Sequence, residues 1–260
     1  MLEFRWADGD YDRLRGLADE LIRLQPDVVV TSGVGTRVLK EATATIPIVV
    51  AVSSDAVAAG LVASLARPGG NITGSTAFGP EISAKRLELL KEAVARLARV
   101  AVLLNPGSSA PSVDLDAVKK TAMALKVELL EAQARSPREF DDAFALMLRQ
   151  RADGVVVLSD SMFVANSRRL GELSAASRLP GAGSDEYPSG GGLLAYGVNF
   201  PVLWRRAPYF VDRILKGGNP ATIPVERATK FELTYNVKAA KAMGLPVQQP
   251  LVLRADQVIQ

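Results

Sequence analysis

Small polar residues follow four short apolar stretches of the chain, and their types and positions suit the binding of a small molecule. The stretches cover residues 28–33, 48–55, 100–109 and 155–160, and each ends in Ser, Thr, Asn, Asp, Gly or Pro just where a helical pattern begins. A short β-branched run of this kind is typical of a buried parallel strand. Ligands of open α/β sheets bind outside the carboxyl ends of the strands, so these residues are the candidates for a binding site.

Two of these loops lie in the first half of the chain and combine hydroxyl groups with helix starts. Ser32, Gly33 and Thr36 stand where a helical pattern begins, and the N–H groups of a helix N-terminus attract a carboxylate or phosphate. The same hydroxyls could serve as an ordinary N-cap, and this loop taken alone favours that interpretation. Ser53 and Asp55 repeat the arrangement, and Asp55 either caps a helix or receives a ligand ammonium group.

The second half of the chain supplies amide, carboxylate and aromatic groups at corresponding positions. Asn105 and Ser109 bound an Asn-Pro-Gly-Ser-Ser turn, and Asp160 and Phe163 follow the next apolar stretch. Phe163 either faces a ligand or packs inward, and the sequence leaves both open. Further along, the chain offers one carboxylate and two phenol rings, at Asp185, Tyr187 and Tyr196.

The composition restricts the chemistry that these residues can perform. The 260 residues include no Cys and no His, which excludes thiol nucleophiles, imidazole bases and the usual zinc ligand sets. Residues 33–35 (Gly-Val-Gly) complete neither a dinucleotide fingerprint nor a P-loop. The net charge of +3 comes from scattered residues, so nucleic acid is not implied. We therefore expect a site that holds a ligand without transforming it, with no cofactor and no metal.

The alternation of periodic patterns predicts an α/β protein with parallel sheets in two similar lobes. We expect strands at 4–7, 28–31, 46–52, 71–76, 100–104, 127–131, 154–158 and 180–183. We expect helices at 10–25, 33–44, 55–66, 83–97, 112–125, 137–150, 162–177 and 201–216. The pattern starts afresh after Arg99, which indicates a second sheet.

Several segments resemble the ABC-transporter substrate-binding proteins of the tryptophan/tyrosine-binding-like group. The most specific are Ala-Arg-Pro-Gly-Gly-Asn-Ile-Thr-Gly at 66–74 and the ending that begins Lys-Phe-Glu-Leu at 230–233, and the similarity runs along essentially the whole chain. The resemblance implies a type I periplasmic-binding-protein fold, with two Rossmann-like lobes, three hinge crossings and a small ligand between the lobes. Carried over to this chain, the strand-end ligand contacts fall on Ser32, Gly33, Ser53, Asp55, Thr76, Asn105, Ser109, Asp160, Phe163, Asp185, Tyr187 and Tyr196.

The same resemblance implies a domain order and a departure at the N-terminus. We expect lobe 1 at 1–80, a connecting helix at 81–98, lobe 2 at 99–190, a return to lobe 1 at 191–220 and a C-terminal segment at 221–260 that crosses back to lobe 2. Similar proteins begin with a signal and a first strand and helix, and this sequence shows neither these elements nor a signal peptide. That first strand would lie between the segments 3–7 and 28–31, so we expect unpaired backbone groups at this place.

The function that the resemblance implies is solute capture for an ABC importer. We expect a monomer in the periplasm that binds a small carboxylate-bearing, aromatic or amino-acid-like ligand, closes about its hinge and delivers the ligand to the permease subunits. The carboxylate would lie at the helix N-termini near Ser32 and Ser53, and the ring against Phe163, Tyr187 or Tyr196. A ligand-sensing regulatory domain and a two-lobed Rossmann-like enzyme are the alternatives.

Overall fold

The computed structural model describes residues 1–8, 10–53, 55–77, 79–108 and 111–260, and these residues form two compact units. Unit 1 comprises Met1–Phe78 and Asn199–Thr229, and unit 2 comprises Gly79–Val198 and Lys230–Gln260. The chain therefore passes from one unit to the other three times. We describe each unit by itself.

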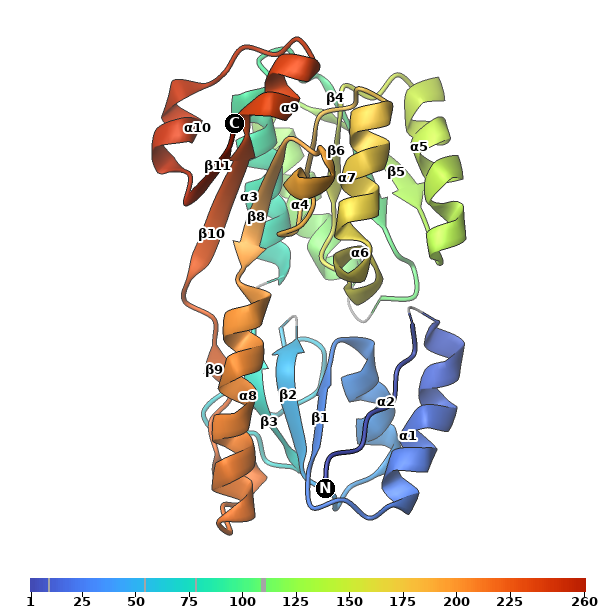
Figure 1. The fold of residues 1–260 in the computed structure, drawn as a ribbon, viewed down its shortest axis with the longest axis vertical. Helices are drawn as coiled ribbons and strands as arrows, with labels where there is room; N and C mark the ends of the chain where they lie inside the picture. The colour runs from blue at the N-terminus through green and yellow to red at the C-terminus, as the bar shows by residue number, and fades with distance from the viewer. Residues whose placement is uncertain (9, 54, 78, 109–110) are drawn as a thin grey trace. The chain divides into compact units, whose positions relative to one another are not determined.

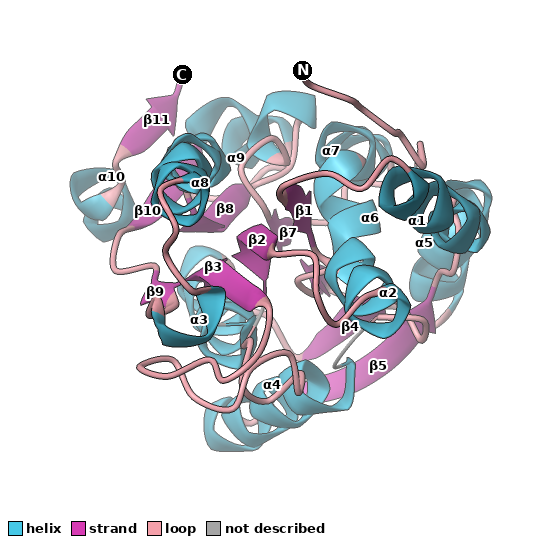
Figure 2. Cartoon of the chain, turned by 90° about the horizontal axis from the view of Figure 1, so that it is seen from below, coloured by secondary structure: helices cyan, strands magenta, loops and turns pink. Residues whose placement is uncertain are grey.

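Unit 1 is built on a four-stranded sheet with the order β1-β2-β3-β9. Its strands are β1 (Val29–Ser32), β2 (Ile48–Ser53), β3 (Ile72–Thr76) and β9 (Glu226–Arg227), and every neighbouring pair is parallel. The flanking helices are α1 (Leu14–Arg23), α2 (Val34–Ala42) and α8 (Phe200–Leu215), with short 3-10 turns at Tyr11–Arg13 and Pro220–Thr222. Figure 2 shows α8 on one side of these strands and α1 and α2 on the other.

The central strand β2 explains why the sheet of unit 1 is covered on both faces. All six of its residues are buried. Ile48 and Val50 join the cluster formed with α1 and α2, whereas Val49 and Ala51 pack with Phe210 of α8. Successive side chains of a strand point to opposite faces, so an uninterrupted apolar run fills both cores.

Unit 2 is built on a seven-stranded mixed sheet with the order β11-β10-β8-β7-β6-β4-β5. Its strands are β4 (Arg99–Leu104), β5 (Glu128–Gln133), β6 (Gly154–Val157), β7 (Gly181–Gly183), β8 (Leu194–Val198), β10 (Phe231–Asn236) and β11 (Gln257–Ile259). Strands β4 to β8 pair in parallel, and only β10 runs antiparallel to its neighbour β8. The carboxyl ends of β4, β6, β7 and β8 therefore meet at one edge.

Helices cover both faces of the sheet of unit 2. They are α3 (Gly79–Ala93), α4 (Pro111–Leu125), α5 (Phe140–Arg149), α6 (Ser161–Ala165), α7 (Ser167–Ala176), α9 (Val237–Ala242) and α10 (Gln249–Arg254), with 3-10 turns at Pro137–Glu139 and Pro188–Gly190. Figure 1 shows α3 and α4 behind the sheet and α5 and α7 in front of it. The largest apolar cluster joins α3, α4, α9 and α10 to β4, β6, β8 and β10.

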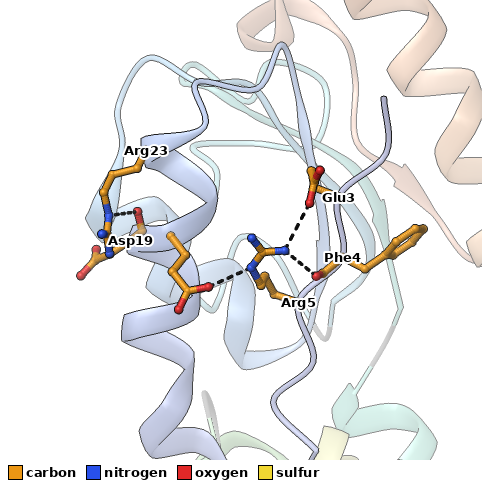
Figure 3. A network of polar contacts seen from close by, with 6 residues as sticks. Glu3, Phe4, Arg5, Asp19 and Arg23 are labelled. Atoms are coloured by element: carbon orange, nitrogen blue, oxygen red, sulfur yellow. Dashed lines mark hydrogen bonds and ion pairs between the residues drawn. The ribbon is translucent and has the colours of Figure 1, made fainter.

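The strand predicted at residues 4–7 is wrong. The segment is not part of the sheet, and the side chains of Phe4 and Trp6 stack on each other at 6.1 Å while remaining mostly exposed. Figure 3 shows what holds the segment instead: Arg5 Nε donates to Glu20 Oε2 of α1 at 2.8 Å, and Arg5 Nη1 donates to the carbonyl oxygen of Phe4 at 2.8 Å. A strand needs a neighbouring backbone to bond with, and this segment has none among the described residues.

The helix predicted at residues 55–66 is also wrong. The segment makes a turn in which the N–H of Ala59 donates to the carbonyl of Asp55, and it then departs from the helical path at Gly60, whose φ is +66°. Left-handed φ values are accessible to glycine without a steric penalty, so Gly60 ends the turn. Leu61 and Val62 are nevertheless buried, because the loop folds back onto the core of unit 1.

Three further boundaries differ from the expected ones. The predicted helix 162–177 is divided at Asn166, whose backbone N–H and Nδ2 both donate to the carbonyl of Met162, at 3.1 and 2.8 Å. The expected connecting helix 81–98 corresponds to α3, which packs on β6, β7, β8 and α4 and belongs to unit 2. The expected return at 191–220 begins later, at Asn199, because β8 pairs with β7 and β10. None of the described helices is long and apolar enough to cross a membrane.

Candidate functional site

The parallel register of unit 1 brings three predicted residues to one edge of its sheet. Ser32 at the end of β1 lies opposite Val52 of β2, and Ser53 at the end of β2 lies opposite Thr76 of β3. The carboxyl ends of parallel strands meet at one edge, so these hydroxyl groups form a row. Ser32 is partly exposed, whereas Ser53 and Thr76 are buried.

Two of these hydroxyl groups also hold the loops that follow them. Thr76 Oγ1 accepts a hydrogen bond from the N–H of Ala56 at 3.1 Å, and Ser53 Oγ makes a long contact of 3.5 Å with the carbonyl oxygen of Ser75. The N–H of Ala77 donates to the carbonyl of Ser53 at 2.8 Å. These residues therefore fix the shape of the edge, whatever they bind.

The start of α2 has no side-chain cap, and the N–H of Thr36 donates to the carbonyl of Gly33 at 3.2 Å. Gly33 is the N-cap residue, with φ +56° and ψ −135°, and it has no side chain to cap the helix. Close packing restricts this turn, since a Cβ on Gly35 would lie 2.8 Å from Thr31 Oγ1. Thr36 is fully buried, and its Oγ1 has no hydrogen-bond partner among the described residues, so it faces the interior of unit 1.

The sequence left two roles open for Asp55, capping and binding of a ligand ammonium group, and in the structure its carboxylate caps the turn that follows. Its Oδ1 accepts hydrogen bonds from the N–H groups of Val57 and Ala58, both at 3.0 Å. Because only a turn follows, the helix N-terminus expected next to Ser53 is not present, and the expectation of a second helix dipole for a ligand carboxylate is wrong. The side chain of Asp55 is still partly exposed.

In unit 2 the predicted amide and carboxylate groups are close to each other. Asn105, which follows β4, approaches Asp160, which follows β6, with Asn105 Nδ2 at 3.4 Å from Asp160 Oδ1. Asn105 Oδ1 accepts from the N–H of Gly107 at 2.9 Å, and Asp160 caps α6 by accepting from the N–H groups of Met162 and Phe163. Both residues are buried, so their geometry is fixed by these contacts. Ser109 lies outside the described residues.

Of the three predicted aromatic rings, two lie in the core of unit 2. Phe163 is 1% exposed and packs against Phe140 with ring centroids 5.9 Å apart. Tyr187 is 0% exposed, and its ring fills the space left by Gly181, Gly183 and Gly192, where any added Cβ would lie within 2.6 Å of it. Burial raises the pKa of the Tyr187 hydroxyl. Neither ring offers a surface to a ligand in this conformation.

The third ring, Tyr196 of β8, is half-buried and stacks on Phe231 of β10 at 6.0 Å. Burial raises the pKa of its hydroxyl, with the neighbouring Lys85 acting in the opposite direction. Asp185, which follows β7, is partly exposed and its charge acts on Arg86. The edge of unit 2 therefore brings together Asn105, Asp160 and Asp185, with the rings of Phe163 and Tyr187 packed beneath.

Two charged residues at this edge escaped the sequence analysis. Arg86 of α3 is 3% exposed and Asp114 of α4 is 5% exposed. Arg86 Nε donates to the carbonyl of Tyr196 and Arg86 Nη1 to the carbonyl of Val157, both at 2.8 Å, with Ser159 Oγ 3.5 Å from Nη1. The guanidinium group thus joins the ends of β6 and β8.

The surroundings of these two residues shift their pKa values. Burial lowers the pKa of Arg86 to about 10, against the opposing charges of Asp185 and Asp114. Burial raises the pKa of Asp114 to about 7, which the charge of Arg86 opposes and that of Glu81 reinforces. A signal for both was present in the sequence, since each interrupts a buried helical stripe: Ile82, Leu90 and Ala93 around Arg86, and Val118 and Ala122 after Asp114.

The polar groups of the candidate site are suited to binding a small molecule. Its donors and acceptors are hydroxyl, amide, carboxylate and guanidinium groups, most of them engaged in fixing the strand ends. The described residues contain no cluster of carboxylates that could hold a metal ion. Such an edge of fixed polar groups is typical of solute recognition.

Comparison with known proteins identifies the family. The model of the ABC transporter substrate-binding protein family matches residues 1–259. A tyrosine-binding protein of Clostridioides difficile (strain R20291) is 24% identical over 247 residues, which make up 94% of this chain and 70% of that protein. Among solved structures, a conserved domain protein from Vibrio cholerae is 25% identical, with a TM-score of 0.92 and coverage of 99% of this chain and 87% of that one.

A second solved structure carries a ligand. It is an ABC domain from Streptococcus pneumonia in complex with L-Trp, 22% identical, with a TM-score of 0.91 and coverage of 100% of this chain and 90% of that one. The α/β architecture and the tryptophan/tyrosine-binding-like resemblance expected from the sequence are confirmed. The chain belongs to the ABC transporter substrate-binding protein family and has the type I periplasmic-binding-protein fold.

Proposed function

We propose that this protein is the substrate-binding component of an ABC importer and captures a small carboxylate-bearing solute of the aromatic or amino-acid type. The observation that carries the proposal is the family match along residues 1–259. The tyrosine-binding relative and the structural similarity to the L-Trp complex support the ligand class. The protein acts outside the cytoplasm as a monomer, passes its ligand to permease subunits and carries out no reaction of its own.

The chemistry of the strand ends supports this ligand class. In unit 1 the uncapped start of α2 and the hydroxyl of Ser32 offer hydrogen bonds to a carboxylate. In unit 2 the edge carries the partly exposed Asp185 and the buried Asp160, and the buried Arg86 holds the strands β6 and β8 in place. We infer that the ligand contacts both sets of strand ends when the protein closes about its hinge. The ligand then binds the closed form more tightly than the open form, and this difference in affinity shifts the protein toward the closed form.

A thermal-shift panel tests the proposal. The purified chain is heated in the presence of L-tryptophan, L-tyrosine, L-phenylalanine, their deaminated acids, branched-chain amino acids and a sugar control. A ligand at 100 times its Kd stabilises the native state by about 2.7 kcal/mol, which is a shift of several degrees. Stabilisation by the aromatic or amino-acid members alone supports the proposal, and a uniformly flat panel contradicts it.

A further inference from the structure

Four turns of unit 2 bring basic residues to the edge of its sheet that lies opposite the candidate site. These turns lead into β4, β5, β6 and β7, and together they contain six basic and two acidic residues. They cover residues 94–99, 125–128, 149–154 and 176–181. The strands are parallel, and Arg99 at the start of β4 lies opposite Glu128 at the start of β5, with the starts of β6 and β7 continuing the row. We call this row of turns the basic edge.

The two carboxylates of the basic edge are engaged locally. Glu128 pairs with Arg99 at 2.9 Å, and Asp153 Oδ2 accepts hydrogen bonds from the backbone N–H groups of Ala98 and Arg99, at 3.1 and 2.8 Å. The other basic side chains of the edge are exposed and form no ion pair with a residue that the structure describes; they are Arg96, Lys126, Arg149, Arg151 and Arg178. The edge therefore presents an excess of positive charge.

Three of these cations occupy backbone positions that favour glycine. Lys126, Arg151 and Arg178 follow α4, α5 and α7 with φ values of +55°, +57° and +51°. At each position, the N–H groups of this residue and of the next one donate to carbonyls of the last helical turn. Glycine fills the equivalent position after α8 and α9, at Gly217 and Gly244. A cation anywhere in the last turn would complement the helix dipole, so the dipole alone does not explain why cations replace glycine at this edge.

Exposed apolar side chains stand beside two of these cations. Met123 of α4 is 72% exposed, and its carbonyl accepts from the N–H of Lys126 at 3.2 Å. Leu148 of α5 is 46% exposed, and its carbonyl accepts from the N–H of Arg151 at 3.0 Å. Cations next to exposed apolar groups suit an anionic bilayer, where the charges approach lipid phosphates and the apolar groups enter the boundary of the acyl chains. A nucleic acid would match the charges but leave the apolar groups in water.

We propose that the basic edge of unit 2 docks on the surface of a membrane that contains anionic phospholipids. The inference goes beyond solute capture, because the basic edge lies at the amino ends of the strands and the candidate site of unit 2 lies at their carboxyl ends. Lipid and solute therefore bind at opposite edges of one sheet, and neither needs the other. Each cation near such a surface contributes about fivefold in affinity, and this attraction weakens as salt is added.

Cosedimentation of the full chain with lipid vesicles tests the proposal. Vesicles of equal parts of phosphatidylglycerol and phosphatidylcholine are compared with vesicles of phosphatidylcholine alone, at low salt and at about 0.5 M salt. The test variant combines Lys126→Gly, Arg151→Gly and Arg178→Gly, which removes three charges where glycine fits the backbone without strain. The control variant removes three exposed cations outside the basic edge, by the substitutions Arg23→Gln, Lys120→Gln and Arg205→Gln. Thermal unfolding establishes that both variants are folded.

We expect wild type to bind the mixed vesicles at low salt, to bind them less at high salt and to prefer them to phosphatidylcholine vesicles. The glycine variant should lose about 20-fold or more in affinity, and the control variant should stay within about threefold of wild type. Replacing the apolar groups by Met123→Gln with Leu148→Gln should weaken vesicle binding about threefold or more. The same replacement should leave binding to a short DNA duplex unchanged.

Several results would overturn the inference. One is an equal loss in the glycine and control variants, because binding would then follow net charge alone. Another is wild-type binding to the DNA duplex as tight as to the mixed vesicles, because the edge would then recognise any polyanion. If the glycine variant does not fold, wild type decides, since no preference for mixed over phosphatidylcholine vesicles overturns the inference. None of these results bears on the proposed capture of a solute, which is measured without lipid.

Discussion

The side chain of Arg86 on α3 reaches the backbone of Tyr196 on β8, with Nε 2.8 Å from the carbonyl oxygen. The same guanidinium group binds Val157 of β6, so one buried cation connects two strands that are separated by β7 in the sheet. The guanidinium thus supplies a charged donor to each of these two carbonyl groups, and hydrogen bonds from a charged donor are stronger than those from a neutral one. The edge that carries Asp160 and Asp185 is thus fixed from behind by a helix.

The first prediction concerns this connection. Arg86→Met keeps an unbranched apolar stem but is shorter than arginine and has no nitrogen donors, so the carbonyls of Val157 and Tyr196 lose their hydrogen bonds to Arg86. Removing one member of a buried charged network typically destabilises by about 3–5 kcal/mol. Urea unfolding of the variant measures the loss. The control is Lys85→Met on the same helix, whose partner Glu88 is largely exposed, and which should cost less than about 1 kcal/mol. Equal losses of unfolding free energy in the two variants would show that Arg86 stabilises the fold no more than the exposed Lys85 does.

The second prediction concerns the pH dependence of stability. The pKa of Asp114 is about 7 in the folded protein and 3.8 as its ordinary value, so the folded state holds a proton that the unfolded state has released between these values. The stabilising contribution of Asp114 to the free energy of unfolding is therefore fully present below about pH 4. It is lost as the pH rises toward 7, by up to about 1.4 kcal/mol per pH unit. Subtracting the profile of Asp114→Asn from that of wild type should isolate this slope, and a flat difference between pH 4 and 7 would refute it.

The third prediction concerns Tyr187. Its hydroxyl is buried near Ser174 without a hydrogen bond of good geometry to any residue that the structure describes. Tyr187→Phe should change the free energy of unfolding by less than about 1 kcal/mol, because no bond is lost, and should leave ligand affinity unchanged. Tyr187→Ala should cost about 3–5 kcal/mol, because it empties the space against Gly181 and Gly183. A tenfold loss of ligand affinity in Tyr187→Phe would contradict this prediction and show that the hydroxyl takes part in ligand binding.

The fourth prediction concerns Thr76 in unit 1. Thr76→Val is nearly isosteric but cannot accept the hydrogen bond from the N–H of Ala56, which would leave a buried donor unpaired. We expect a loss of about 1–3 kcal/mol in unfolding free energy. Thr76→Ser keeps the oxygen and should recover most of that loss. If Ser and Val variants are equally stable, the loop after β2 does not depend on this bond.

The sequence was sufficient for the layers of the fold and for the strand ends at which the candidate site residues lie. The apolar runs at 28–33, 48–55 and 100–109 contain the parallel strands β1, β2 and β4. Burial on both sheet faces explains the unbroken apolar pattern of β2 and of most of β4, whereas Val30 of β1 is 40% exposed. The resemblance of the motifs at 66–74 and 230–233 to the family is confirmed by the match along the whole chain. Polar residues at strand ends were found because topology alone places them.

The parts that sequence reasoning missed depend on tertiary contacts. The apolar pattern of 55–66 fits a helix, but the left-handed φ of Gly60 and the burial of Leu61 and Val62 against the sheet decide otherwise. Residues 4–7 have the composition of a strand but no backbone to pair with among the described residues. The inward packing of Phe163 was one of two open outcomes, and the neighbouring Phe140 decides it. The burial of Tyr187 against Gly181, Gly183 and Gly192 was not foreseen. Arg86 and Asp114 each interrupt an apolar helical stripe, but the sequence analysis took them for ordinary helix charges, and the packing of α3 on α4 shows that both are buried.

The central claim is that this protein captures an aromatic or amino-acid-like solute, and direct titration calorimetry of the full chain tests it. L-Tryptophan and L-tyrosine are titrated into the protein, with their deaminated acids as further ligands. The account predicts saturable binding of at least one of these compounds with one ligand per chain and a Kd in the micromolar range or tighter, about −8 kcal/mol or more favourable. Heats that do not exceed dilution for all of them, with protein shown to be folded, would contradict it.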